Sequence, residues 1–238
     1  MKFFIRRLAV VAALTLVAGA SNAAVPSHLY QLNGSYVDTN GGASLVANGG
    51  TLGASGYSFA ANQGLSVDGV LNANEYTIDT SFQFAETGGY RRIVDFLGGT
   101  SDTGLYNLSG ALNFYNLATG VASPLSNGQQ VRVTASRDAT GTFSGYVNGV
   151  LQFSFVDSTN LASFSTVGNR AIFFQDDNAV GGEASAGSVD YIAIYDHALS
   201  AAEISTLAAP VPEPQTVAML LAGLLAVGAM ARRQRQRV

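Results

Sequence analysis

The sequence predicts an all-β domain, an antiparallel β-sandwich with one short helix near its C-terminal end. The first reason is residues 76–84, whose apolar and polar side chains alternate strictly, as in a strand with one buried face. The second is Asn148-Gly149, which joins two alternating segments and favours the type I′ turn of a hairpin. The third is a series of short apolar segments between glycine-rich turns from Tyr30 to Tyr195, which is typical of a sandwich.

The same kind of pattern predicts the other strands in order along the chain. We expect them at residues 92–97, 104–108, 111–116, 130–136, 143–147, 150–156, 170–175 and 189–195. In the strand after Asn148-Gly149, we expect Leu151, Phe153 and Phe155 to share the buried face. Residues 34–56 are rich in glycine, serine, alanine and asparagine, and they suit either a linker or an edge region of the same domain.

One helix is expected at the end of the domain, over residues 200–207. Ser200 and Glu203 form the capping-box pattern, in which each side chain hydrogen-bonds the backbone N–H of the other residue. The apolar Ile204 follows directly. We therefore assign residues 25–209 to the folded domain.

Residues 1–24 have the three parts of a secretory signal peptide. Basic residues start the segment, residues 8–20 are apolar, and small residues lie before the expected cleavage point. The apolar run is too short for a typical membrane-spanning helix. We expect export, with cleavage by signal peptidase after Ala23 or Ala24.

Residues 210–238 also have three parts. The motif Val211-Pro212-Glu213-Pro214 comes first, and its two prolines keep the segment out of helical structure. The apolar run from Thr216 to Ala231 predicts a single transmembrane helix at residues 215–231, somewhat short for a bilayer of ordinary thickness. The segment ends in a basic cluster, which the positive-inside rule places in the cytoplasm: Arg232, Arg233, Arg235 and Arg237.

This tail resembles the PEP-CTERM sorting signal of Gram-negative bacteria in all three parts. The resemblance implies that Pro212, Glu213 and Pro214 are recognised by exosortase, a membrane-embedded transpeptidase-like protease. It also implies that the helix anchors the chain transiently in the inner membrane before processing. The protein would then reach the cell surface or the extracellular space.

The later half of the domain resembles the LamG-like, or concanavalin A-like, jelly roll of bacterial surface proteins. Two segments carry the resemblance: NGQQVRVTASRDATGTFSGYVNGVL at residues 127–151 and GSVDYIAIYDHALSAAEISTL at residues 187–207. They are similar to that family's strand and Tyr-Val-Asn-Gly hairpin, and to its closing strand and capped helix. Gln129-Gln130 stand where the family often has Trp-His, which leaves the subfamily open.

Composition and charge exclude several functions. Residues 25–209 hold five basic and 15 acidic residues, a formal charge of −10, and such a surface repels nucleic acid. The chain has no cysteine and only two histidines, which excludes thiolate metal sites and makes multi-histidine sites improbable. Divalent cations or a neutral polymer match this surface better.

The densest acidic segment indicates a calcium site. Asp176, Asp177 and Glu183 lie close together at a strand-to-loop junction, and calcium takes six to eight hard oxygen ligands from carboxylates and carbonyls. The resemblance to the jelly-roll family supports calcium, because its members often bind the ion at a rim. A solvated acidic loop without a metal fits the same pattern.

No catalytic residue is assigned. Glycoside hydrolases need two carboxylates flanking the scissile bond, about 5 Å apart for retention, and no Glu-x-Asp-x-x-Glu string is present to provide them. Arg91-Arg92 is expected to form a surface ion pair with Glu86 across a turn.

These features predict a non-catalytic, exported binding or structural protein that associates with extracellular polysaccharide or matrix. Tyr90, Tyr106 and Tyr115 are candidate exposed rings that stack on sugars, although the tyrosines and phenylalanines of a β domain more often belong to core and rim packing. The alternatives are a glycoside hydrolase-like enzyme on the same fold and a protein-binding adhesin.

Overall fold

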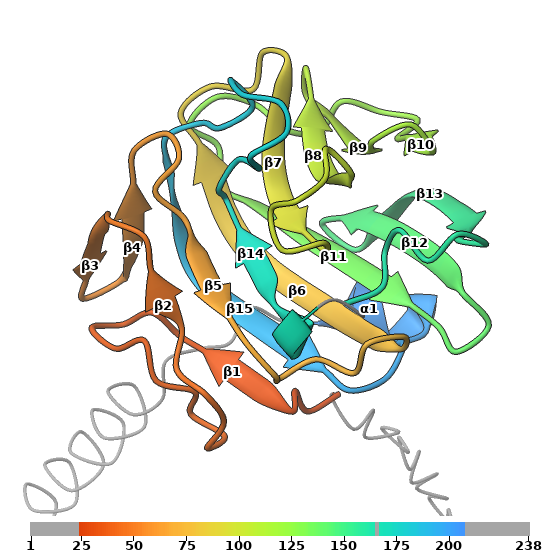
Figure 1. Cartoon of the computed structure of the whole chain (residues 1–238), viewed down its shortest axis with the longest axis horizontal. Coiled ribbons are helices and arrows are strands. Elements are labelled where there is room, and N and C mark those ends of the chain that lie inside the picture. Colours follow the sequence, from red (N-terminus) through yellow and green to blue (C-terminus); the bar gives the residue numbers. More distant parts are fainter. Residues whose placement is uncertain (1–23, 165–166, 208–238) are drawn as a thin grey trace, which may run out of the picture.

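The alternating segments form two antiparallel sheets that face each other as the layers of a sandwich (Figure 1). The computed structural model describes residues 24–164 and 167–207. Within them, no helix combines the length and apolar character needed to cross a membrane. The signal peptide up to residue 23, the sorting motif, the transmembrane helix expected at 215–231 and the arginine-rich tail lie outside the described residues.

The first sheet, sheet A, has eight strands within the described residues. The closing strand β15 (Gly187–Tyr195) pairs along one edge with β6 (Tyr76–Phe84) and along the other with both β4 (Gly56–Phe59) and β1 (His28–Tyr30). The main path through the sheet adds four further strands around these, in the order β13-β12-β11-β6-β15-β4-β3: β3 (Thr51–Gly53), β11 (Val131–Arg137), β12 (Thr142–Val147) and β13 (Val150–Val156).

The second sheet, sheet B, has seven strands in the part of the chain that the structure describes. A single 3-10 turn at Val167–Asn169 leads into its interior strand β14. The strands follow the order β10-β9-β8-β7-β14-β5-β2: β2 (Val46–Ala47), β5 (Leu65–Val67), β7 (Tyr90–Asp95), β8 (Gly104–Leu108), β9 (Ala111–Phe114), β10 (Ala118–Thr119) and β14 (Ala171–Phe173).

The core between the sheets is rich in aromatic side chains. Phe82 and Phe84 on β6 pack against Phe174 at the end of β14, with ring centroids 5.0 Å and 6.0 Å from the Phe174 ring. Phe114 on β9 packs against Phe143 on β12, with centroids 5.0 Å apart. Large aromatic rings therefore join the inner faces of the two sheets and provide much of the buried apolar area.

Each expected strand forms, with different ends in several cases. The segment expected at 170–175 is a strand only over Ala171–Phe173, because Phe174 has a φ of 59° and turns the chain. Residues 34–56 contain β2 and β3, which are edge strands of sheet B and sheet A, so the edge-region interpretation of this segment is confirmed.

The short C-terminal helix is confirmed as α1 (Ala201–Thr206). Ser200 is the N-cap, and its side chain accepts a hydrogen bond from the Glu203 backbone N–H. The Glu203 carboxylate accepts one in return from the Ser200 backbone N–H at 2.8 Å. Both halves of the expected capping box are thus present.

A β-bulge changes the expected face of β13. Gly145 is opposite Phe153, but the next residue of β12, Tyr146, is opposite Leu151, so Gln152 is the extra residue. Phe153 and Phe155 therefore face the core, whereas Leu151 is 47% exposed, and its expected burial was wrong. Gly145 is required at the close contact, since a Cβ there would lie 2.7 Å from the Phe153 ring.

We predict that Phe153→Ala lowers the free energy of unfolding by about 3 kcal/mol, because the ring is only 8% exposed and its removal leaves a cavity beside Phe143. Leu151→Ala on the same strand is the control and should cost less than about 1 kcal/mol. Urea unfolding of both variants measures this. Equal losses would contradict the bulged register.

Candidate functional site

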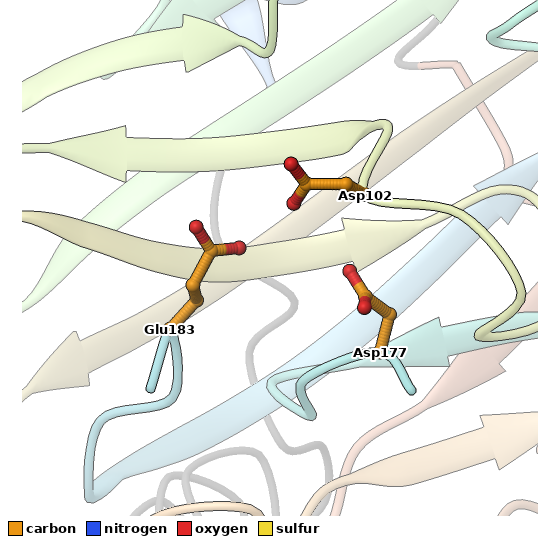
Figure 2. A group of neighbouring side chains, drawn as sticks. All are labelled: Asp102, Asp177 and Glu183. Carbon is orange, nitrogen blue, oxygen red and sulfur yellow. The ribbon is translucent and has the colours of Figure 1, made fainter. Parts of the chain in front are cut away.

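Three carboxylates from two connections meet beside β7, the middle strand of sheet B (Figure 2). Asp102 lies in the connection from β7 to β8, Asp177 follows β14, and Glu183 lies on the segment that leads into β15. One oxygen of each carboxylate lies within 4.8 Å of the others. Asp102 is 75 residues from the nearer of its two partners in the sequence numbering, so only the fold brings the group together.

The guanidinium of Arg92 on β7 lies at the centre of this group and is fully buried. It donates a hydrogen bond to Asp177 through Nη2, and its Cζ lies 4.5 Å from the centroid of the Tyr106 ring. Among the described residues, five carboxylates lie within 4.0 Å of its nitrogens: Asp95 at 3.0 Å, Glu183 at 3.6 Å, Asp102 at 3.7 Å, Asp176 at 4.0 Å and Asp177. One positively charged guanidinium thus lies close to five carboxylates. We call this set the Arg92 cluster.

The loop from residue 176 to residue 183 is held by its own carboxylates. Asp176 accepts hydrogen bonds from the backbone N–H groups of Asp177 at 3.1 Å and Glu183 at 2.8 Å. The second oxygen of Asp177 accepts from the N–H of Val180 at 2.8 Å. The Glu183 carbonyl then accepts from the N–H of Arg92 at 2.8 Å, which fixes the loop to β7.

The predicted calcium ligands and the observed group differ in one member. Asp177 and Glu183 converge as the sequence indicated, but Asp102 is the third residue, while Asp176 closes the loop. Sequence analysis missed Asp102 and Arg92, and it placed Arg92 in a surface ion pair. That pair forms through Arg91 instead, whose Nη2 lies 3.9 Å from Glu86.

Burial dominates the electrostatics of the Arg92 cluster. Burial raises the pKa of Glu183 to about 7, and the nearby charges of Asp102 and Asp176 act in the same direction, against a hydrogen bond and the Arg92 charge. Burial also raises the pKa of Asp95. The Oε2 atom of Glu183 has no hydrogen-bond partner among the described residues. Negative charge is therefore incompletely balanced here.

The cluster fits calcium in the type and spacing of its oxygen atoms. Carboxylates are the ligands that calcium prefers, and Oε2 of Glu183, which accepts no hydrogen bond from the described residues, can accept a further cation contact. Arg92 already lies against the same three groups, so an ion would share them with the guanidinium. Asp102, Asp177 and Glu183 are the residues that would hold it.

Three tyrosines lie beside the Arg92 cluster. Tyr106 on β8 is opposite Arg92 on one side and Asn113 on the other, so these side chains share the outer face of sheet B. The ring of Tyr90 packs edge-on against Tyr106 and Tyr115, with centroids 5.5 Å and 5.6 Å away. Tyr90 and Tyr115 are partly exposed, whereas Tyr106 is buried, so the expected exposure of Tyr106 was wrong.

The fold is that of a two-sheet antiparallel β-sandwich domain. The profile of the concanavalin A-like lectin/glucanases superfamily matches residues 53–205, more than half of the chain, and the protein belongs to this family. The PEP-CTERM protein-sorting motif matches residues 210–236, as the sequence indicated. The protein is therefore an exported one, anchored at the membrane before processing. No curated protein is significantly similar to the chain in sequence.

Solved structures with the same fold include three of different biological origin. The botulinum neurotoxin serotype D binding domain has a TM-score of 0.54 at 16% identity, over 76% of this chain and 50% of that one. The Trypanosoma rangeli sialidase bound to difluorosialic acid has a TM-score of 0.60 at 15% identity, over 76% and 32%. Domain 4 of an extracellular arabinanase from Geobacillus stearothermophilus, in complex with arabinotriose, has a TM-score of 0.54 at 17% identity, over 77% and 98%. The chain thus spans half or less of the first two but nearly all of the third.

We predict that stability falls as the pH rises through about 7, because the folded state holds the Glu183 proton more tightly than the unfolded chain does. This proton favours folding at low pH, and the contribution is lost as the folded Glu183 ionises. In the presence of chelator, Glu183→Gln should flatten the fall in melting temperature between about pH 5 and pH 8. The control is Glu86→Gln, at an exposed carboxylate. Parallel curves for wild type and Glu183→Gln would contradict the raised pKa.

Proposed function

We propose that the protein is a non-catalytic binding module, delivered to the cell surface or extracellular space, where it associates with polysaccharide. The observation that carries this proposal is the pair of partly exposed rings, Tyr90 and Tyr115, fixed edge-on on the outer face of sheet B. An aromatic face complements the C–H face of a sugar ring, and rings held by their neighbours lose little entropy on binding.

The polar surroundings of these rings support a sugar ligand. Tyr115 lies close enough to Asp102 for this carboxylate to raise its pKa, so a hydrogen-bond acceptor lies beside the aromatic pair. A few polar groups next to a flat apolar surface are the usual means of fixing a ligand's orientation. The arabinotriose bound to the similar arabinanase domain is consistent with this class of ligand.

Glycoside hydrolysis is the alternative from a different class of function. The fold brings Asp102 and Glu183 together, although no sequence string predicted a carboxylate pair. Both are within 4.0 Å of the Arg92 guanidinium, which competes with any substrate for them. This arrangement favours a structural role for the two carboxylates, and we propose that the protein does not catalyse hydrolysis.

We predict that Tyr90→Ala and Tyr115→Ala each weaken binding to a surface polysaccharide about fivefold or more, the effect of losing one aromatic contact of about 1 kcal/mol. Tyr36→Ala is the matched control, since Tyr36 is also partly exposed but packs against Tyr57. A glycan array followed by calorimetry measures the affinities. Equal affinity for all variants would reject this surface, and release of reducing sugar by the wild type would favour the enzyme.

Calcium binding is a second proposed property of the Arg92 cluster. The converging oxygens of Asp102, Asp177 and Glu183, together with Glu183 Oε2, which accepts no hydrogen bond from the described residues, favour it. An ion bound there would fix the connection from β7 to β8 against the segment that leads into β15. It would thereby stiffen the part of sheet B that carries the tyrosines.

We predict that calcium at about 100 times its dissociation constant stabilises the protein by roughly 2.7 kcal/mol, which corresponds to about 5–10 °C in melting temperature. Magnesium should do less, because it retains its waters and a small octahedral shell. Glu183→Gln should abolish the difference between the ions, whereas Asp68→Asn, at an exposed pair with Arg170, should leave it unchanged. Equal shifts by both ions in the wild type would indicate charge screening alone.

A further inference from the structure

Both ends of the described domain pack onto one apolar cluster on the outer face of sheet A. We call it the exit cluster; it consists of Tyr146, Tyr191, Ala193, Tyr195, Leu199 and Ile204. Ala24 at the N-terminal end and Leu207 at the C-terminal end both contact it. β1 pairs with β15, the strand that provides Tyr191, Ala193 and Tyr195 to this cluster. The chain therefore enters and leaves the domain at one face.

The C-terminal exit is fixed by Arg132 on β11. Its guanidinium donates hydrogen bonds to the carbonyl oxygens of Ile204, at 3.0 Å, and Leu207. These groups lie at the end of α1, where carbonyls lack helical partners and a cation is favourable. Behind Arg132 is the buried Asp79, whose Oδ1 lies 3.8 Å from Nε and accepts a hydrogen bond from Thr134.

The β12–β13 hairpin lies against the same exit. A Cβ at Gly149, in its turn, would lie 3.2 Å from the Cα of Ser205 in α1. The next two residues are exposed apolar side chains, Val150 at 63% and Leu151 at 47%. Val25, next to Ala24, is 77% exposed. Exposed apolar side chains thus lie next to both segments through which the ends of the domain pack onto the exit cluster, and apolar patches mark contact surfaces.

The sorting motif begins very close to this exit. Pro212 is five residues beyond Leu207, a reach of at most about 17 Å for extended chain. The apolar run begins about nine residues beyond Leu207, a reach of roughly 30 Å. A domain of this size is about 40 Å across. While the tail is anchored, the far side of the domain therefore cannot turn toward the membrane, and the exit face must stay near it.

We propose that the exit face, bordered by Val25, Val150 and Leu151, is the surface on which the membrane-embedded processing protease docks while it holds the sorting motif. The proposal rests on sorting through the PEP-CTERM motif. A protease that binds Pro212, within about 17 Å of the folded domain, also contacts the surface of that domain. The apolar residues around the exit suit a protein partner, and Arg132, the basic residue at this exit, is engaged with α1, so anionic lipid is a poorer match.

The absence of cysteine in the chain allows a direct test by site-specific labelling. Val150→Cys and Val46→Cys replace the same residue type at the same exposure of 63%, the first at the exit and the second on β2 of the opposite sheet. The full-length chain is placed in vesicles of phosphatidylethanolamine and phosphatidylglycerol, with or without a catalytically inactive form of the protease. A maleimide coupled to polyethylene glycol then reports the accessibility of each cysteine.

We expect the protease to slow the maleimide reaction of the cysteine at position 150 at least fivefold relative to vesicles without protease. The cysteine at position 46 should react at the same rate with and without the protease. Protection in protease-free vesicles would show that lipid covers the face and would overturn the proposal. Equal reactivity of both positions with the protease present would overturn it too.

A second experiment distinguishes a failure of sorting through the motif from a failure of docking. With active protease, the Pro212→Ala, Pro214→Ala double variant should remain uncleaved by intact mass, and normal cleavage of it would reject sorting through the motif. Arg132→Gln should slow cleavage of the otherwise normal motif, and Arg132→Lys should restore part of the rate while melting temperatures stay similar. If the double variant stays uncleaved but Arg132→Gln is cleaved as fast as wild type, Arg132 has no positioning role.

Discussion

The burial of the Arg92 guanidinium is the constraint on which the connections around β7 in sheet B depend. A charge taken out of water costs several kcal/mol unless partners surround it, and the partners here come from separate parts of the chain. Asp95 is the last residue of β7 and Asp102 follows that strand, while Asp176, Asp177 and Glu183 follow β14. The acidic groups depend equally on Arg92, since without it they would repel one another. The ion cluster therefore fixes two connections that apolar packing alone leaves free.

In sheet A, too, buried or engaged arginines hold connections of the chain in place. Arg137 at the end of β11 is buried, pairs with Asp157 at 3.1 Å and donates a hydrogen bond to Asn160. Arg132 on the same strand holds the end of α1. In a domain with five basic residues and a formal charge of −10, three arginines are used to fix connections rather than to provide a basic surface. The acidic groups left on the surface explain why a neutral polymer or a divalent cation is the better-matched ligand.

Local patterns predicted the fold well because they depend on neighbouring residues. The alternation in β6, the Asn148-Gly149 turn and the capping box of α1 are all properties of a few consecutive positions. The bulge at Gln152 was missed, because it arises from the contact between Gly145 and Phe153 on different strands. For the site, the acidic segment could be recognised in the sequence, but the residues that pack against it, Arg92 and Asp102, could not. Arg92 looked like a surface residue because four of its five carboxylates lie 10 or 84 to 91 residues away in the sequence.

The two outer faces of the sandwich differ in a way that connects the proposals. The outer face of sheet A is covered by α1 and by the start of the chain, which pack onto the exit cluster. The outer face of sheet B carries Tyr90 and Tyr115 beside the Arg92 cluster. Because the outer faces of a two-layer sandwich point in opposite directions, a domain held by its exit face directs the tyrosines away from the membrane. A polysaccharide outside the cell envelope could then be engaged while the chain is still anchored, and removal of the tail would leave that surface unchanged.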